Sequence, residues 1–155
     1  MALFNIRVYG ILIDEYKRIL VSDEFIRGAY ITKFPGGGLE FGEGTRDCLA
    51  REFKEETGLD VTIGEHLYTT DFYQRSAFNP QHQIISIYYF VHCNTTDTLI
   101  TQEKPFEFTA EQIADPQGES EVFRWIEWNN FNEGAVSLPI DKVVANKLKE
   151  QKSKK

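Results

Sequence analysis

The sequence predicts a single domain of mixed α-helices and β-strands, of the α/β or α+β class. Its 155 residues are enough to bury a core and are typical of one domain. Apolar residues make up 41% of the chain and aromatic residues 14%, which is the composition of a globular protein. Segments typical of strands and helices follow one another in the order β-β-β-α-β-β-β-α, which favours a mixed central β-sheet with helices packed against it. We expect the domain to span residues 1–151 and residues 152–155 to be a frayed basic tail.

Three strands are expected before the first helix. Residues 5–13 and 18–22 are rich in β-branched side chains and are joined by a short polar link, so we interpret them as a β-hairpin. Residues 29–34 form a third short strand. The Pro-Gly-Gly-Gly sequence at its end stops this strand, because neither a helix nor a central strand tolerates such a run.

A helix is expected over residues 45–57. Thr45 can cap its beginning, and Gly58 is placed to adopt the left-handed conformation just past its end. At about 100° per residue, Leu49 and Phe53 fall on the arc that faces the core. A separate arc carries three carboxylates, because positions i, i+3 and i+4 share one face of a helix. These residues are Glu52, Glu55 and Glu56.

The second half of the chain is expected to hold three more strands and a terminal helix. Residues 66–73 and 82–93 are the first two strands, and 82–93 is apolar on both faces, as in a central strand. Residues 94–120 are polar and acidic, which predicts a long mobile loop. Residues 121–128 form the last strand, and residues 138–151 form a helix with a proline near its first turn.

Charge and cysteine content narrow the range of partners and compartments. A net charge of −7 and a pI near 5.0 argue against nucleic acid or an anionic membrane as the main partner. No apolar stretch approaches the ~20 residues that cross a bilayer. The first residues show no signal-peptide cleavage site, and we interpret them as a strand. Cys48 and Cys93 form no CxxC motif, which is typical of a reducing cytoplasm. We therefore expect a soluble cytoplasmic protein.

The three carboxylates on the helix repel one another. Like charges at these spacings cost about 0.2–0.5 kcal/mol per pair, and an anion near the C-terminal end of a helix costs a further ~0.3–1 kcal/mol. Arg51 can relieve Glu55 from position i−4, but no basic residue stands three or four positions from Glu52 or Glu56. A solvated acidic face accounts for this composition. A divalent cation also accounts for the placement, because Mg²⁺ is commonly held by carboxylates and substrate phosphates.

A glycine-rich segment, residues 34–44, leads into this helix. It does not match a P-loop, because Gly42 is followed by Glu43 and not by a lysine. It does not match the dinucleotide fingerprint either, because Phe41 occupies the third glycine position. The glycines permit a tight turn and also let backbone oxygens approach an ion. Glu43 is expected to reach Arg51 and fix the loop on the helix.

The spacing of these residues resembles the signature of a known family. From Gly37 the chain reads glycine, five residues, glutamate, seven residues, Arg-Glu-Phe, one residue, Glu-Glu, one residue, Gly-Leu. This is similar to the complete signature of the Nudix hydrolases, G-x5-E-x7-R-E-U-x-E-E-x-G-U, in which U is a bulky aliphatic residue. It fixes nine positions over 23 residues, 37–59, which we call the box. Phe53 departs from an aliphatic position, and because it lies on the core arc we expect a packing adjustment without a chemical effect.

The resemblance implies a fold, an activity and a set of site residues. The fold is the Nudix-type α/β/α sandwich. The activity is hydrolysis of a nucleoside diphosphate linked to another moiety, X, by attack of water on a phosphorus, with Mg²⁺ as cofactor and Mn²⁺ as a substitute. The implied metal-binding residues are Gly37, Glu52, Glu55 and Glu56. The three glutamates are also implied as catalytic residues, together with a supporting ion pair formed by Arg51 and Glu43.

Residues outside the box complete the predicted site. The family's general base is either a box glutamate or one on a loop elsewhere. Of the outside candidates we choose Glu119, just before the last strand, with Glu121 next. Three basic residues are expected near the phosphates of the substrate, namely Arg27, Lys33 and Arg75.

Two functions remain open from the sequence. One is a metal-dependent pyrophosphohydrolase, and the alternative is a regulatory domain of the same fold that binds a nucleotide or sugar nucleotide without chemistry. Retention of all three box glutamates favours the enzyme. The sequence does not identify the moiety X. The candidate substrates are an NTP or dNTP, ADP-ribose, a sugar nucleotide and a dinucleoside polyphosphate. We expect a small-molecule partner, no nucleic acid and no membrane, and an edge strand offers a route to a homodimer.

Overall fold

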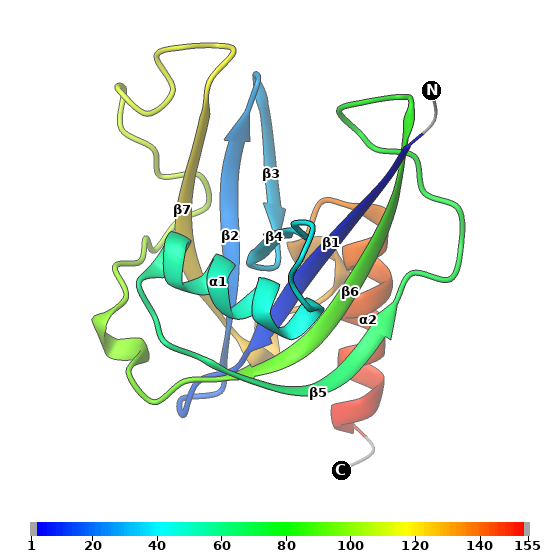
Figure 1. Cartoon of the computed structure of the whole chain (residues 1–155). Helices are drawn as coiled ribbons and strands as arrows, with labels where there is room; N and C mark the ends of the chain where they lie inside the picture. Colours follow the sequence, from blue (N-terminus) through cyan, green and yellow to red (C-terminus); the bar gives the residue numbers. More distant parts are fainter. Residues whose placement is uncertain (1–2, 154–155) are drawn as a thin grey trace. The chain divides into compact units, whose positions relative to one another are not determined.

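The computed structural model describes residues 3–153, and its sheets and helices are drawn in Figure 1. These residues are grouped in two compact units. Residues 3–12 and 35–99 make the first unit, and residues 13–34 and 100–153 make the second. Each unit contains a β-sheet and an α-helix. The predicted class of mixed helices and strands is confirmed, with the strands divided between two sheets instead of forming one.

The first unit is built on a four-stranded mixed sheet with the order β4-β1-β6-β5. Strands β1 (Leu3–Leu12) and β6 (His82–His92) run parallel at its centre. Strand β4 (Gly36–Gly38) pairs antiparallel with β1, and β5 (Thr62–Thr69) pairs antiparallel with β6. The central position predicted for residues 82–93 is therefore confirmed. The three glycines form a short strand at the edge of the sheet.

Strands β1 and β2 (Arg18–Ile26) do not form the predicted hairpin. Strand β1 belongs to the four-stranded sheet, whereas β2 is the middle strand of a three-stranded sheet. The polar link between them is a turn closed by Asp14, whose Oδ1 accepts a hydrogen bond of 2.8 Å from the backbone N–H of Arg18. The turn was predictable from its local residues, but the pairing of each strand depends on partners far away in the sequence.

Helix α1 (Thr45–Thr57) has the predicted bounds. Gly58 follows it with a φ of 77°, the left-handed conformation that ends many helices. The predicted cap was wrong, because the N-cap residue is Gly44. Thr45 is instead the first residue of the helix, and its Oγ1 is hydrogen-bonded to the hydroxyl of Tyr89 at 2.7 Å. The Thr45 hydroxyl thus makes a hydrogen bond with a residue of β6 and does not cap the helix.

The apolar arc of α1 packs against β1 and β4 (Figure 1). Leu49 and Phe53 are buried there, together with Cys48. A Cβ on Gly10 in β1 would lie 2.6 Å from the Phe53 ring, so the helix and the strand approach too closely for a side chain at that position. The phenylalanine in place of an aliphatic residue is therefore accommodated by packing, as predicted.

The second unit contains an antiparallel sheet with the order β3-β2-β7. Strands β3 (Ala29–Lys33) and β7 (Glu119–Glu127) flank β2. Two single-turn helices, η2 (Trp128–Asn130) and η3 (Glu133–Ala135), precede helix α2 (Pro139–Ser153). Residues of α2 spaced four apart lie on one buried face. These are Ile140, Val144 and Leu148.

Residues 94–120 are largely irregular, as predicted, and include the single-turn helix η1 (Thr96–Thr98). Phe106 anchors this segment within the second unit. Its backbone N–H donates to Asp23 Oδ2 at 3.3 Å, and its ring lies against that of Tyr30 with the centroids 5.5 Å apart. The segment therefore has fixed contacts with β2 and β3, which its polar composition did not indicate.

The C-terminal helix is longer than predicted. It continues through Ser153, so the first part of the predicted frayed tail is helical, and residues 154–155 lie outside the described residues. Within residues 3–153, no helix combines the length and apolar character needed to cross a membrane.

Candidate active site

The guanidinium of Arg51 is the centre of an ion-pair network between the glycine-rich loop and α1. Its Nε and Nη2 donate to the two carboxylate oxygens of Glu43 at 3.0 and 2.7 Å, a bidentate pair. Nη2 also donates to the carbonyl oxygen of Gly38 at 3.2 Å. Glu43 Oε1 in turn accepts a hydrogen bond from the backbone N–H of Glu40 at 2.9 Å. The contact expected between Glu43 and Arg51 is present and ties the loop to the helix.

This network changes the pKa values of its members. Hydrogen bonding to Arg51, and then to the backbone N–H of Glu40, lowers the pKa of Glu43 from 4.5 to about 2. The hydrogen bonds with Glu43 are also the main cause that raises the pKa of Arg51. Burial, followed by a hydrogen bond with Glu43, raises the pKa of the neighbouring Cys48 thiol to about 12. Cys48 is therefore a protonated thiol at neutral pH and a poor nucleophile.

We expect the variant Glu43→Gln to melt at a lower temperature than the wild type at neutral pH, with a difference that depends on pH. The pKa of Glu43 in the folded chain, about 2, is below its ordinary value of 4.5. The carboxylate therefore stabilises the fold above pH 4.5, and this contribution is lost as the pH falls through about 2. Thermal unfolding measured between pH 7 and pH 2 should show the two melting temperatures converging.

The matched control for this measurement is Glu65→Gln. Glu65 is an exposed acid on β5, outside the Arg51 network. Its substitution should leave the melting temperature close to that of the wild type across the range. A gap between Glu43→Gln and the wild type that stays constant down to pH 2 would show that the ionised carboxylate is not what stabilises the loop.

The acidic face of α1 is partly neutralised by the same arginine. Arg51 Nη1 donates to Glu52 Oε1 at 3.1 Å and to Glu55 Oε2 at 3.2 Å. The side chain of Glu52 is 13% exposed and that of Glu55 is 59% exposed. The contact with Glu55 agrees with its i, i+4 spacing. The contact with Glu52 was not predicted, because adjacent residues on a helix do not normally face each other.

Arg7 on β1 is a second cation beside the acidic face, and this role was not predicted from the sequence. It lies opposite Gly38 in the pairing of β1 with β4. Its pKa is raised first by Tyr9, whose hydroxyl accepts a hydrogen bond from Arg7 Nε, and also by the carboxylates of Glu52 and Glu56. Glu56 therefore has a basic neighbour on the sheet, and Glu52 has one there in addition to Arg51. A charged residue inside an apolar strand was the available signal.

Gly37 leaves the space in which the Glu52 carboxylate lies. A Cβ on Gly37 would lie 2.4 Å from Glu52 Cδ and 2.6 Å from each carboxylate oxygen. The absence of a side chain thus brings the backbone of β4 and a carboxylate of α1 within reach of one ligand. Carboxylate and carbonyl oxygens are the donors that Mg²⁺ prefers, so the residues present fit a divalent cation.

The predicted metal ligands are not drawn together into a closed cage. Among residues 3–153, no three Asp, Glu, His or Cys side chains are arranged so that they could hold a metal ion. Arg51 explains part of the separation of these carboxylates from a common centre, because its Nη1 donates hydrogen bonds to both Glu52 and Glu55. Glu55 is the more exposed of the two and has the greater freedom to turn towards a cation.

The two glutamates that we ranked first as the general base outside the box both belong to β7 in the second unit. Glu119 begins this strand and is exposed. Glu121 Oε2 accepts a hydrogen bond of 2.5 Å from Ser22 Oγ. Glu121 is therefore engaged within its own sheet. Glu119 presents its carboxylate to solvent and stays our candidate.

The three predicted substrate-binding cations have different surroundings. Lys33 is 5% exposed, and its Nζ lies 2.9 Å from Glu24 Oε2, an ion pair that was not predicted. Arg27 lies in the turn between β2 and β3 with a φ of 47°. Arg75 is exposed between β5 and β6, and a hydrogen bond with Tyr73 raises its pKa. Of the three, Arg75 shares a unit with α1.

A family model described as the NUDIX domain matches residues 3–146, which is most of the chain. The chain belongs to the Nudix family. Solved structures of other proteins are similar to it over nearly the whole of its length. The solution structure of the ORF135 protein of E. coli has a TM-score of 0.67 at 17% identity, covering 99% of this chain and 94% of that one. The MutT protein from Methanosarcina mazei Go1 has a TM-score of 0.65 at 15% identity, covering 97% and 96%.

A Nudix hydrolase from Nitrosomonas europaea is similar as well, with a TM-score of 0.62 at 17% identity, covering 95% of this chain and 89% of that one. At these identities the structural similarity shows the Nudix fold. Family membership supports the hydrolase class for this chain and implies pyrophosphohydrolase activity. Nudix hydrolases generally use divalent metal ions and act on small nucleotide derivatives. In this Nudix chain the box starts in β4 and ends just past α1, within the first unit.

Proposed function

We propose that this Nudix hydrolase cleaves the diphosphate bridge of a nucleoside diphosphate derivative in a reaction that requires Mg²⁺ or Mn²⁺. Glu52, Glu55 and Glu56 would hold the cation together with the backbone of Gly37. When bound, the cation supplies positive charge to the diphosphate and lowers the pKa of water. The observation that carries the proposal is the contact between Gly37 and the Glu52 carboxylate, since a side chain at residue 37 would fill that space.

The ion pairs of the box support distinct roles for its residues. Arg51 holds Glu43 by a bidentate pair, which fixes the loop and so the position of Gly37 relative to α1. The same guanidinium orients the carboxylates of Glu52 and Glu55. Pre-oriented charges of this kind do not need to reorganise during the reaction. Arg51 and Glu43 are therefore positioning residues, and the glutamates of the acidic face contact the reacting groups.

A carboxylate must also take the proton of the attacking water. We propose Glu119 for this role, because its side chain is exposed at the start of β7. Within the box, Glu55 is the alternative, since more than half of its side chain is exposed. The pH–rate profile of Glu119→Gln distinguishes the two, because loss of the base removes its acidic limb, whereas a limb that persists in this variant would favour Glu55.

We further propose that residues 1–151 act as one catalytic domain and that the protein works in the cytoplasm. Cys48 and Cys93 are free thiols, which suits a reducing compartment. Strand β5 is the last strand of its sheet and is available to pair with a second copy in a homodimer.

The alternative function is a regulatory domain that binds a nucleotide or sugar nucleotide without cleaving it. One observation favours this alternative. Arg51 and Arg7 provide partners for the box glutamates without a cation, so part of their charge has a structural explanation. The close approach of Gly37 to the Glu52 carboxylate favours the enzyme, because it brings backbone oxygens of β4 and a carboxylate of α1 within reach of one cation.

A substrate screen separates the two functions. The purified protein is incubated with Mg²⁺ and a panel of a nucleoside triphosphate, ADP-ribose, a sugar nucleotide and a dinucleoside polyphosphate. Chromatography then identifies the products. We expect one class to yield a nucleoside monophosphate and a phosphorylated X, and chelation of the metal to stop the reaction. Saturable binding of a member of the panel without any product would instead support the regulatory domain.

A further inference from the structure

Strand β1 begins on a part of the sheet that is open to solvent. Val8 is buried on the face of β1 against which α1 packs. Towards the start of the strand the burial falls, from the half-buried Ile6 to Phe4, which is 69% exposed. These three residues share one face, because side chains alternate along a strand. The apolar face of the sheet therefore continues beyond the part that α1 covers.

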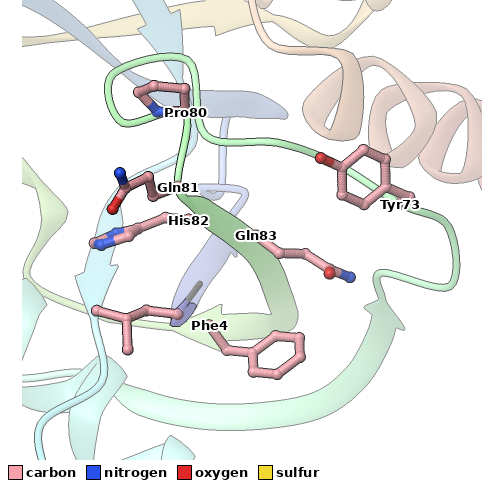
Figure 2. A pocket seen from close by; sticks show the side chains of 7 residues that line it. Phe4, Tyr73, Pro80, Gln81, His82 and Gln83 are labelled. Carbon is pink, nitrogen blue, oxygen red and sulfur yellow. The ribbon is translucent and has the colours of Figure 1, made fainter. Parts of the chain in front are cut away.

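A hollow of about 350 Å³ lies at the same place, where β1 and β6 begin (Figure 2). Its lining includes Leu3 and Tyr73, which are 48% and 66% exposed, beside Phe4. Figure 2 shows the rings of Phe4 and Tyr73 on one side of the start of β6. We call the surface around this hollow, made of Leu3, Phe4, Tyr73, Gln81 and Gln83, the aromatic end. The proposed cleavage chemistry uses none of its residues.

Backbone hydrogen bonds hold the aromatic end in shape. The N–H of Leu3 donates to the carbonyl oxygen of Gln81 at 3.1 Å. In the connection between β5 and β6, the carbonyl oxygen of Gln74 accepts a hydrogen bond of 2.8 Å from the N–H of Ile84. Tyr73 therefore lies on a segment that is fastened to β6. A partner would meet a preformed surface, which lowers the cost of ordering on binding.

The segments that form the aromatic end carry no acidic residues. The chain contains 24 aspartates and glutamates, but none of them lies within residues 1–13 or 72–96. Because the net charge is −7, two copies of the chain repel each other over most of their surface. Like charges placed opposite each other in an interface are costly. Contact between two copies is therefore favoured where neither presents an acid, as at the aromatic end.

The exposed area is sufficient for a contact between two copies. Leu3, Phe4 and Tyr73 together expose roughly 350 Å² of apolar surface, taking about 200 Å² for each side chain. A twofold contact buries the same surface on both copies, about 700 Å² in all. Apolar atoms make up only about 60% of a typical interface, so the whole contact would bury about 1,200 Å². This exceeds the ~1,000 Å² expected of a specific interface.

The edge of β5 is less suitable for pairing with a second copy. Its register with β6 shifts twice, between Ile63 and His66 and between His66 and Tyr68. Such irregularities interrupt the regular ladder that another strand would need. Arg46 of α1 also donates hydrogen bonds to the carbonyl oxygens of Ile63 and Gly64, at 2.9 and 2.8 Å. These two oxygens are therefore already engaged.

We propose that the protein forms a twofold-symmetric homodimer through the aromatic end. The rings of Phe4 and Tyr73 form the apolar core of the contact, and the amides of Gln81 and Gln83 make hydrogen bonds around it. The proposal gives the homodimer a defined surface in place of the β5 edge. It does not depend on the proposed reaction, because no residue of the box takes part in the contact.

The first test measures association of the full chain by analytical ultracentrifugation over a range of concentrations. We expect the wild type to dimerise. The variants Phe4→Glu and Tyr73→Glu should each raise the Kd of the dimer at least about thirtyfold, because each removes an aromatic contact and places a charge in both halves of the interface. The matched control is Tyr16→Glu, since Tyr16 is 68% exposed but lies in the turn between β1 and β2. Its Kd should equal that of the wild type.

The second test needs no variant and so does not depend on the folding of one. Amide NMR spectra of the wild type are recorded during dilution, and we expect the signals of the aromatic end to shift while those of β5 stay in place. A wild type that is monomeric at every concentration would overturn the proposal. A dimer that persists in both glutamate variants, or shifts confined to β5, would do so as well. Neither test measures hydrolysis, so such a result would leave the proposed function standing.

Discussion

Replacing Glu55 or Glu56 with glutamine is expected to abolish Mg²⁺-dependent hydrolysis while the protein stays folded. Glutamine keeps the size of each side chain but removes the charge that would hold the cation and the diphosphate. Loss of one such group typically lowers the rate by a factor of about 10² to 10⁴. We therefore expect kcat/KM to fall at least about a hundredfold for the substrate identified by the screen. Product release should be measured beside circular dichroism and thermal unfolding of the same samples.

The fold should tolerate these two changes. The ion pair that Glu55 makes with Arg51 is on the surface, and pairs of this kind contribute less than about 1 kcal/mol. The control is Asp47→Asn, which removes an exposed acid of the same helix that lies outside the acidic face. Its turnover should match the wild type. Unchanged turnover in both glutamine variants would end the assignment of these residues to catalysis.

The parts of the site that were predictable from sequence are those set by local spacing. The bounds of α1 follow from the apolar period and from Gly58, whose left-handed conformation ends the helix. The contact of Glu43 with Arg51 was expected because Glu43 lies near the end of the glycine-rich loop and Arg51 lies in the helix that directly follows. These features need information only from within the box, where neighbours in the chain are also neighbours in space.

The parts that were missed depend on contacts between distant segments. Arg7 reaches the acidic face because β1 pairs with β4, and no pattern within β1 reveals that pairing. The predicted hairpin failed for the same reason, since β2 pairs with β7 across most of the chain. Thr45 was expected to cap α1, but Tyr89 of β6 supplies a different partner. In each case local propensity was overruled by a tertiary contact.

Substitution of each of the three adjacent glycines of β4 by alanine should affect the protein differently. In Gly36→Ala, the new Cβ would lie 2.1 Å from the Val8 carbonyl oxygen, at a residue with a φ of 149°. The backbone of β1 cannot move away easily, so the overlap between the Cβ and the carbonyl oxygen destabilises the fold. An alanine held at this φ costs a further ~1–3 kcal/mol. In Gly38→Ala, the nearest atom would be 3.6 Å away, an ordinary contact. We therefore expect a strongly lowered melting temperature for Gly36→Ala and an unchanged one for Gly38→Ala.

Gly37→Ala is expected to lose activity without losing stability. Its Cβ would collide with the carboxylate of Glu52, which is the end of a flexible side chain and can rotate away while the backbone stays in place. Rotation would move this oxygen donor away from the backbone of β4, so we expect hydrolysis to fall at least about a hundredfold, as for loss of a catalytic group. The decisive comparison is between melting temperature and kcat/KM across the three alanine variants.

A Gly37→Ala protein that melts like the wild type and hydrolyses at the same rate would show that the position of Glu52 beside β4 does not matter for the reaction. If Gly37→Ala instead melts as early as Gly36→Ala, the glycine is needed for the fold of the edge strand, and its link to the cation would have no support.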